Sequence, residues 1–170
     1  MKHSSHRGFC LAGVSLIESL IALGVLAVAI PAVLAVMTEA GKSGLASQAE
    51  TRSTWMIPAC LDEIRASRGG SPQYFSPTAS GQAFPPPGEL WALAFSPEGR
   101  PIGKLPRTLY SNGIRELDGQ TVRYIASLAS SEVPGSDASA RLLNVRISLE
   151  YPAASPETQR RKLVFHTRMP

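Results

Sequence analysis

The most prominent pattern along the chain is an apolar run near its start. The run extends from Val14 to Met37, and Glu18 is the only charged side chain in it. About 20 apolar residues in a helix, each rising about 1.5 Å, cross the hydrocarbon core of a bilayer. The run therefore predicts one transmembrane helix over residues 14–37.

After the run, the pattern changes to that of an amphipathic helix. Positions repeat at three- or four-residue steps: Leu45, Ala49, Arg52, Met56, Cys60 and Ile64. Polar residues occupy other faces: Gln48, Glu50, Arg65 and Arg68. This spacing predicts a helical stalk over residues 38–70 that rests on a sheet. Gly69-Gly70 predicts its end, and Pro58 either starts a second helical piece or kinks the first.

The remaining residues, 71–170, predict a linker and an antiparallel β head. Residues 71–88 are rich in Pro, Ser and Gly, which disfavours a regular backbone ladder. Strand-like runs follow at residues 90–95, 121–129, 142–151 and 163–167. Ser96-Pro97-Glu98-Gly99 is typical of a turn, so we expect a hairpin after the first run.

Alternation in the third run predicts a sheet with one face in water. Val145, Ile147 and Leu149 alternate with Arg146, Ser148 and Glu150. A helix followed by antiparallel strands predicts an α+β fold, with a long N-terminal transmembrane and stalk helix packed on a small β-sheet head.

Charges before the apolar run predict the orientation of the helix in a membrane. Lys2 and Arg7 precede it, and no acid occurs up to Gly13. Positive charge beside a span keeps that end in the cytoplasm. We therefore expect a cytoplasmic N-terminus and a head on the outer side of the membrane.

Glu18 is costly inside a membrane span, so its presence predicts a partner group. A second interpretation needs no partner, because Glu18 lies near the start of the span and its side chain could reach the interface.

The residues around Glu18 resemble a known processing site. Residues 13–23, Gly-Val-Ser-Leu-Ile-Glu-Ser-Leu-Ile-Ala-Leu, resemble the cleavage and methylation site of type IV pilins and type II secretion pseudopilins. The resemblance implies that a prepilin peptidase removes the leader, residues 1–13, by cutting after Gly13, and methylates the new N-terminus at Val14. It also implies a pilin-like fold, and assembly in which Glu18 pairs with the amine of a neighbouring subunit.

The same resemblance implies the partners and the location of the protein. The partners are the prepilin peptidase and N-methyltransferase, other pilin or pseudopilin subunits, and an inner-membrane assembly platform. The protein would span the inner membrane once, with a periplasmic head, before entering a pilus or pseudopilus filament. Val14 in place of the common phenylalanine, and Pro31 about one turn early, favour a minor pilin or pseudopilin over a major pilin.

A narrower resemblance covers most of the head. Tyr74-Phe75, Glu98-Gly99-Arg100 and Leu149-Glu150-Tyr151-Pro152-Ala153 are similar to segments of the prepilin-like Verru_Chthon cassette B proteins.

Three other interpretations compete with a filament subunit. Small residues such as Ala27, Ala29 and Ala32 could form the cleavage site of an ordinary secretory signal peptide, although the apolar run is longer than such peptides need. The helix could also be a plain single-pass anchor. Third, the head could be a binding module at a filament tip, displayed to a substrate, DNA or a surface; an exposed aromatic patch including Trp91 would favour this.

Charge and cysteine content narrow the function further. The chain has a net charge of +4, and loss of Lys2 and Arg7 with the leader leaves 15 basic and 13 acidic side chains, or +2. This balance is too weak to indicate nucleic-acid binding. Cys10 lies in the leader, so a processed chain keeps only Cys60, which cannot form an internal disulfide and is expected in the core.

Candidate catalytic groups are sparse. His166 would be the only histidine after processing and is expected to be an ordinary strand residue. Asp62-Glu63 point in different directions on a helix and are expected in solvent. Arg160-Arg161-Lys162 predicts a solvated turn, or alternatively a surface for DNA or other anions, and Ser111-Asn112-Gly113 predicts a turn. The sequence therefore predicts no enzymatic activity, no cofactor and no metal site.

Overall fold

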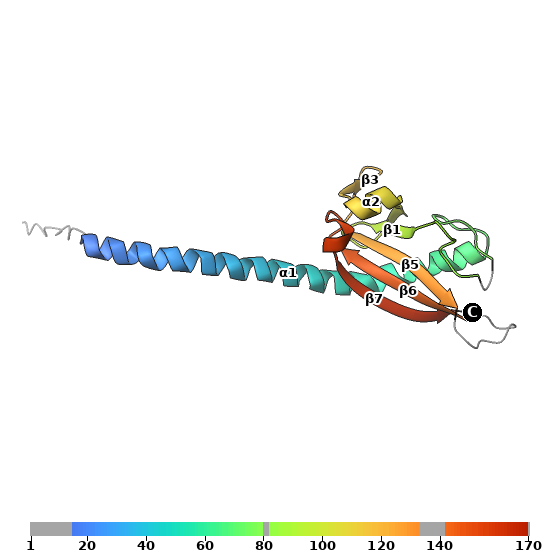
Figure 1. The fold of residues 1–170 in the computed structure, drawn as a ribbon, viewed down its shortest axis with the longest axis horizontal. Helices are drawn as coiled ribbons and strands as arrows, with labels where there is room; N and C mark the ends of the chain where they lie inside the picture. The colour runs from blue at the N-terminus through green and yellow to red at the C-terminus, as the bar shows by residue number, and fades with distance from the viewer. Residues whose placement is uncertain (1–14, 80–81, 133–141, 170) are drawn as a thin grey trace, which may run out of the picture. The chain divides into compact units, whose positions relative to one another are not determined.

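The computed structural model describes residues 15–79, 82–132 and 142–169. The chain forms two units, Met1–Leu45 and Ala46–Pro170, and we call the second unit the head. One helix, α1 (Leu16–Arg68), begins in the first unit and ends in the second. The head adds a five-stranded sheet, a two-stranded ribbon and two short helical segments (Figure 1).

Helix α1 is one continuous element of 53 residues. It includes Pro31 and Pro58 without a break, so the expectation that Pro58 starts a second helix is wrong. The predicted end at Gly69-Gly70 is confirmed. There the Gly69 N–H donates to the carbonyl of Arg65 at 2.9 Å, and Gly70 has a φ of +77°, a conformation that suits glycine at a helix end.

The five-stranded sheet is antiparallel throughout, in the order β2-β1-β5-β6-β7. Its strands are β1 (Trp91–Phe95), β2 (Pro101–Lys104), β5 (Tyr124–Glu132), β6 (Leu143–Tyr151) and β7 (Arg161–Met169). Each predicted strand-like run overlaps one of them, and the hairpin expected after residue 95 joins β1 to β2. The α+β class and its antiparallel sheet are thus confirmed.

The larger core cluster joins the head part of α1 to one face of the sheet. Its members include Ala49, Met56, Cys60 and Ile64 from α1, and Leu93, Ala126, Leu128, Val145, Ile147 and Leu149 from the strands. Burial of a large aliphatic side chain stabilises a fold by about 1.5–3 kcal/mol. The predicted amphipathic face is therefore largely correct, although Arg52 in that series is exposed.

Residues 71–88 contain no strand among those described, as predicted, but they contribute to the core. The Trp91 ring lies between Phe75, at a centroid distance of 4.5 Å, and Phe84, at 5.0 Å. The Phe84 N–H donates to the Ser130 hydroxyl at 2.7 Å. This segment is consequently fixed to the sheet rather than a free linker.

A second, smaller core cluster covers part of the opposite face of the sheet. Its residues come from the sheet and from the segments that follow β2 and β6: Ala92, Ala94, Leu105, Tyr110, Ile114, Val122, Ile125 and Ala153. Helix α2 (Arg107–Asn112) supplies Tyr110. The expected turn at Ser111-Asn112-Gly113 is instead the end of α2, and Gly113 has a φ of +91°. A Cβ there would lie 2.6 Å from the Ala154 carbonyl oxygen, so the site requires glycine.

Three small elements complete the head. Strands β3 (Glu116–Leu117) and β4 (Gln120–Thr121) form the ribbon, and η1 (Glu157–Gln159) is a short 3₁₀ turn before β7. Because α2 and its neighbours cover one end of the sheet, Ser148 and Glu150 are buried while Arg146 is exposed. The prediction that this face of β6 lies wholly in water is therefore wrong at Ser148 and Glu150.

Candidate functional site

The N-terminal part of α1 presents an apolar surface that is exposed. Every residue from 15 to 41 is exposed. The large apolar side chains of this surface include Leu20, Leu23, Val28, Leu34 and Met37. This helix is long and apolar enough to span a membrane, by length and composition. We call residues 16–37 the apolar segment.

Glu18 lies in the first turn of α1 and is exposed. Its backbone N–H donates to the Ser15 carbonyl at 2.9 Å, so the helix is already formed at the acid. The predicted cleavage residues, Gly13 and Val14, lie outside the described residues. The structure therefore places one carboxylate at the start of an exposed apolar helix.

Cys60 occupies the buried face of α1 within the head, as expected. Burial raises the pKa of the Cys60 thiol from 9.0 to about 12, and the nearby Glu63 carboxylate adds to this rise. A thiol with so high a pKa is a poor nucleophile near neutral pH. Cys60 thus serves as a small apolar core residue.

The burial of Glu63 contradicts the prediction that Asp62 and Glu63 both lie in solvent. Its carboxylate is buried and accepts backbone N–H groups from Tyr74 at 2.7 Å, Phe75 at 3.1 Å and Gln73 at 3.3 Å. Asp62 is exposed, as expected. Glu63 therefore holds the segment after α1 against the helix, and its role is structural.

A buried charge cluster joins β6 to α2 and to the start of β7. The Glu150 carboxylate accepts from Arg160 at 3.0 Å and from the Tyr110 hydroxyl at 2.7 Å, and it pairs with Lys162 at 3.0 Å. The Arg160 guanidinium also donates to the Ser155 carbonyl at 2.8 Å and to the Tyr110 carbonyl. Burial, followed by the hydrogen bond to Glu150, raises the pKa of the Tyr110 hydroxyl.

This cluster corrects the prediction for Arg160-Arg161-Lys162. Arg160 is buried, whereas Arg161 and Lys162 are exposed in β7 rather than in a turn. The side chains of Glu150 and Arg160 have no exposed surface, so the pair has no room for a reactant and instead fastens the elements around it.

Metal-binding and histidine chemistry have little basis in the described part of the chain. Within it, no group of three or more His, Cys, Asp or Glu side chains could hold a metal ion. His166 lies exposed on β7, as expected of an ordinary strand residue.

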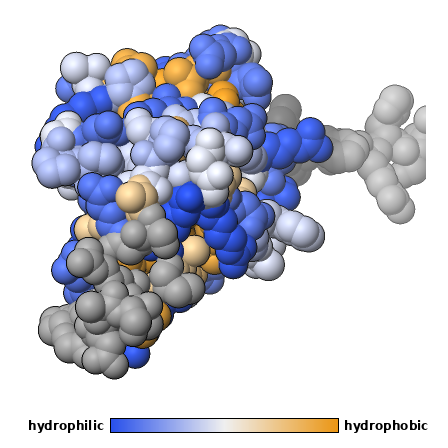
Figure 2. All heavy atoms as spheres, turned by 90° about the vertical axis from the view of Figure 1, so that its right-hand side faces the viewer, coloured by the Kyte–Doolittle hydropathy of each residue, from blue (hydrophilic) through white to orange (hydrophobic). Residues whose placement is uncertain are grey.

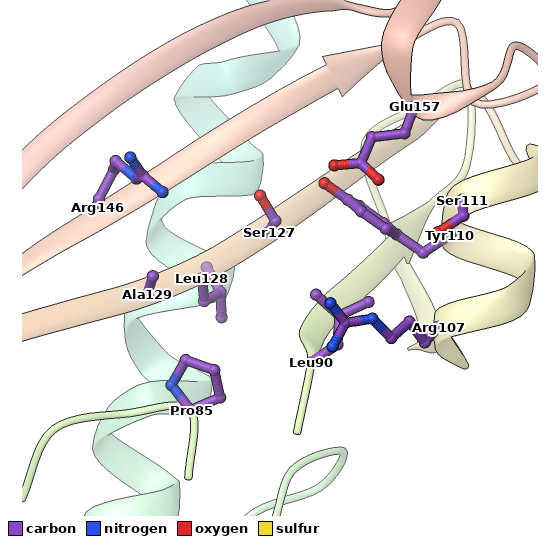
Figure 3. Close-up of a pocket in the computed structure, with 10 residues that line it drawn as sticks. All are labelled: Pro85, Leu90, Arg107, Tyr110, Ser111, Ser127, Leu128, Ala129, Arg146 and Glu157. Carbon is purple, nitrogen blue, oxygen red and sulfur yellow. The ribbon is translucent and has the colours of Figure 1, made fainter. Parts of the chain in front are cut away.

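The head has a hollow beside α2 and β5 that sequence reasoning did not identify (Figure 3). Its volume is about 230 Å³. Figure 3 shows Arg146 of β6 on one side and Arg107 of α2 on the other, with Ser127 and Ala129 of β5 between them. A second hollow of about 560 Å³ shares Ala129 and Arg146 with the first.

No aromatic patch forms at Trp91, because its side chain is wholly buried between two rings. In the view of Figure 2, the visible surface of the head is mostly hydrophilic, with small hydrophobic areas. The contact surface that would favour a tip-binding module through Trp91 is therefore not present.

Comparisons of the chain with protein-family models, with curated proteins and with solved structures found no match.

Proposed function

We propose that this chain is a minor pilin or pseudopilin, a subunit that a prepilin peptidase processes and that assembles through its N-terminal helix into an envelope filament. The filament would belong to a type IV pilus or to a protein-secretion machine of the type II kind. The observation that carries the proposal is the exposed apolar segment with the single acid Glu18 in its first turn.

The exposed surface of the apolar segment supports the proposal that this segment lies first in the membrane and then in a filament. In the membrane, lipid tails would cover its leucine, isoleucine and valine side chains. In a filament, the same side chains would pack against the apolar segments of neighbouring subunits. A surface that is apolar over so many turns suits both the membrane and the filament. Its only charged side chain is Glu18, so either lipid tails or apolar side chains can cover the rest.

The position of Glu18 supports a role in setting subunit register. Cleavage after Gly13 would create a positive amine at Val14, a few residues from Glu18. An amine and a carboxylate from adjacent subunits offset each other's desolvation when helices pack together. Buried ion pairs contribute more to specificity than to stability, so Glu18 would select one stagger between neighbours.

The head has its own core, which supports the proposal that it is displayed on the filament as a folded domain. The two core clusters and the buried Glu150–Arg160 pair lie entirely within residues 46–170. A head of this kind needs no contribution from the apolar segment to bury its side chains. It would remain folded in the periplasm and on the filament.

Processing is tested by intact mass and N-terminal sequencing of the full chain, produced in bacterial cells together with a prepilin peptidase. We expect loss of residues 1–13 and a methylated Val14, and we expect a Gly13→Val variant to stay uncut. Gly24→Val is the matched control, because a Cβ at Gly24 meets no atom within 4 Å. An N-terminus between residues 30 and 38, or an uncut wild-type chain, would overturn the proposal.

Assembly is tested separately with Glu18→Gln, which removes the charge and keeps the size. We expect normal cleavage but loss of crosslinked multimers in membranes that contain the assembly machinery. Glu50→Gln, which changes an exposed acid in the head part of α1, should assemble as the wild type does. Equal multimer yield from Glu18→Gln and wild type would refute the register role.

A further inference from the structure

We propose that the outward face of β5 and β6 binds an extended acidic peptide segment of a partner protein, whose carboxylates pair with Arg107 and Arg146. This site lies in the head and does not depend on the proposed cleavage or assembly. Its test changes residues that take no part in cleavage after Gly13 or in pairing by Glu18, so either proposal can fail alone.

The first support is a pair of adjoining hollows. The hollow beside α2 and the hollow over β5 and β6 share Ala129 and Arg146 in their linings, so they lie next to each other, and we call the two together the trough. Their volumes are about 230 Å³ and about 560 Å³. Ligand sites in proteins usually occupy about 300–1,000 Å³, so the trough suits a ligand that continues from one hollow into the other.

The floor of the trough has the period of an extended chain. Ser127, Ala129 and Ser131 alternate along β5, and each lines one or both hollows. Side chains on one face of a strand repeat at about 6.6 Å, and an extended peptide has the same repeat. Because all three floor residues are small, side chains of such a peptide could enter between the larger residues on either side.

The charge of the trough favours carboxylates. Arg107 and Arg146 are exposed, and neither forms an ion pair with a residue that the structure describes. His166 lies opposite Arg146 in the register of β6 and β7 and lines the second hollow. A guanidinium binds a carboxylate through two parallel hydrogen bonds, which gives both affinity and orientation.

Other lining residues favour a peptide over a nucleic acid. Pro85 and Leu90 also line the hollow, and their apolar surface suits apolar peptide side chains next to the acids. Single-stranded nucleic acids bind through exposed aromatic faces, but the aromatic residue in the lining, Tyr110, is buried. Glu157 also lines the hollow, and its carboxylate opposes any anionic group there, so the acids of the peptide must lie toward Arg107 and Arg146 rather than toward Glu157.

The test measures binding of a fluorescent peptide to the full chain in detergent by polarisation. The probe is an acetylated and amidated octapeptide that alternates Glu with Leu. The comparison ligands are the same peptide with Gln in place of Glu and a fluorescent oligothymidylate of twelve nucleotides. We expect the Glu peptide to bind at least tenfold more tightly than either of them.

Two kinds of variant separate charge from shape. We expect Arg107→Ala and Arg146→Ala each to weaken binding of the Glu peptide about tenfold, since each removes a hydrogen bond to a charged group. Ala129→Leu should weaken binding by filling the trough without changing its charge. Arg115→Ala, at an exposed arginine outside the lining of both hollows, is the matched control and should bind as wild type does.

Thermal unfolding of each variant verifies that the head stays folded, which is expected because Arg107 and Arg146 are exposed. Equal affinity for the Glu and Gln peptides, tighter binding of the oligothymidylate, or equal losses in Arg146→Ala and Arg115→Ala would each overturn the proposal.

Discussion

The two parts of helix α1 differ in what covers them. In the apolar segment, residues 16–37, every side chain is exposed and Glu18 is the only charge. In the head, Ala49, Met56, Cys60 and Ile64 are wholly buried against the sheet. A single helix thus contains a buried surface in the head and an exposed surface in the apolar segment.

This difference shows that the two parts of α1 differ in how their apolar side chains are covered. In the head, the buried carboxylates of Glu63 and Glu150 accept hydrogen bonds from backbone and side-chain donors of the head itself. Soluble monomers rarely expose apolar patches larger than a few hundred Å². We therefore expect lipid or other protein chains to cover the apolar segment, whereas the core side chains of the head pack against other residues of the head.

The largest expected effect follows from placing charge in the apolar segment. We expect Val25→Arg combined with Val28→Arg to prevent membrane integration, because each arginine near the centre of a span costs about 2.5–3.5 kcal/mol. Alkaline carbonate extraction of membranes should move the variant from the pellet to the supernatant.

The unfolding midpoint of the head should not change in this variant. That result would show that the stability of the head does not depend on membrane integration of the apolar segment. Thr51→Arg combined with Thr54→Arg, at exposed positions in the head part of α1, is the matched control and should stay in the pellet. Retention of the Val25 and Val28 variant in the membrane pellet would contradict the expectation that the apolar segment is the membrane-spanning part of α1.

The opposite experiment disrupts the head and spares the apolar segment. We expect Glu150→Ala to destabilise the head by about 3–5 kcal/mol, because it leaves the buried Arg160 without its carboxylate partner. Urea unfolding followed by tryptophan fluorescence measures the loss. Glu116→Ala, at an exposed acid, should change stability by less than about 0.5 kcal/mol. A similar small change in Glu150→Ala would show that the buried pair is dispensable.

The sequence predicted those elements of the fold that residues close together in the chain determine. The apolar run, the spacing of Met56, Cys60 and Ile64, and the stop at Gly69-Gly70 all appear within short stretches of sequence. The hairpin after Phe95 likewise follows from the turn residues between its strands. For such elements, the chemistry of a few neighbouring residues decides the structure.

Non-local pairing explains the errors. Asp62 and Glu63 are adjacent on a helix and point in different directions, so the sequence predicts both in solvent, but the partners of Glu63 are backbone groups of residues 73–75. Glu150 appeared solvated because it alternates with apolar residues in β6, but α2 covers that end of the sheet and Arg160 meets it there. No periodicity in the sequence indicates which distant residue will cover a strand.

The candidate sites divide in the same way. Gly13, Val14 and Glu18 were proposed from a contiguous motif, and the structure describes only Glu18 among them. Arg107 and Arg146 come from separate elements, α2 and β6, and meet around one hollow only after folding. Sequence reasoning could not have found this pair, because neither arginine stands in a motif.

The smallest expected effect sharpens the comparison at Cys60, on the covered part of α1. Its thiol pKa is raised from 9.0 to about 12 by burial, with a further rise from Glu63. Above pH 9.0, the unfolded chain loses this proton while the folded chain keeps it, so the free energy of unfolding falls as pH rises. The contribution is complete below pH 9.0 and decreases by about 1.4 kcal/mol for each pH unit up to about 12. The variant Cys60→Ala tests this dependence.

Cys60→Ala removes the pH dependence that the thiol causes, although it lowers stability at every pH because it leaves a small cavity. We therefore expect the stability advantage of wild type over Cys60→Ala, measured by urea unfolding under reducing conditions, to shrink by about 2 kcal/mol between pH 8 and pH 10.5. A constant difference across that range would show that water reaches Cys60, and that this face of α1 is less completely covered than its packing against the sheet indicates.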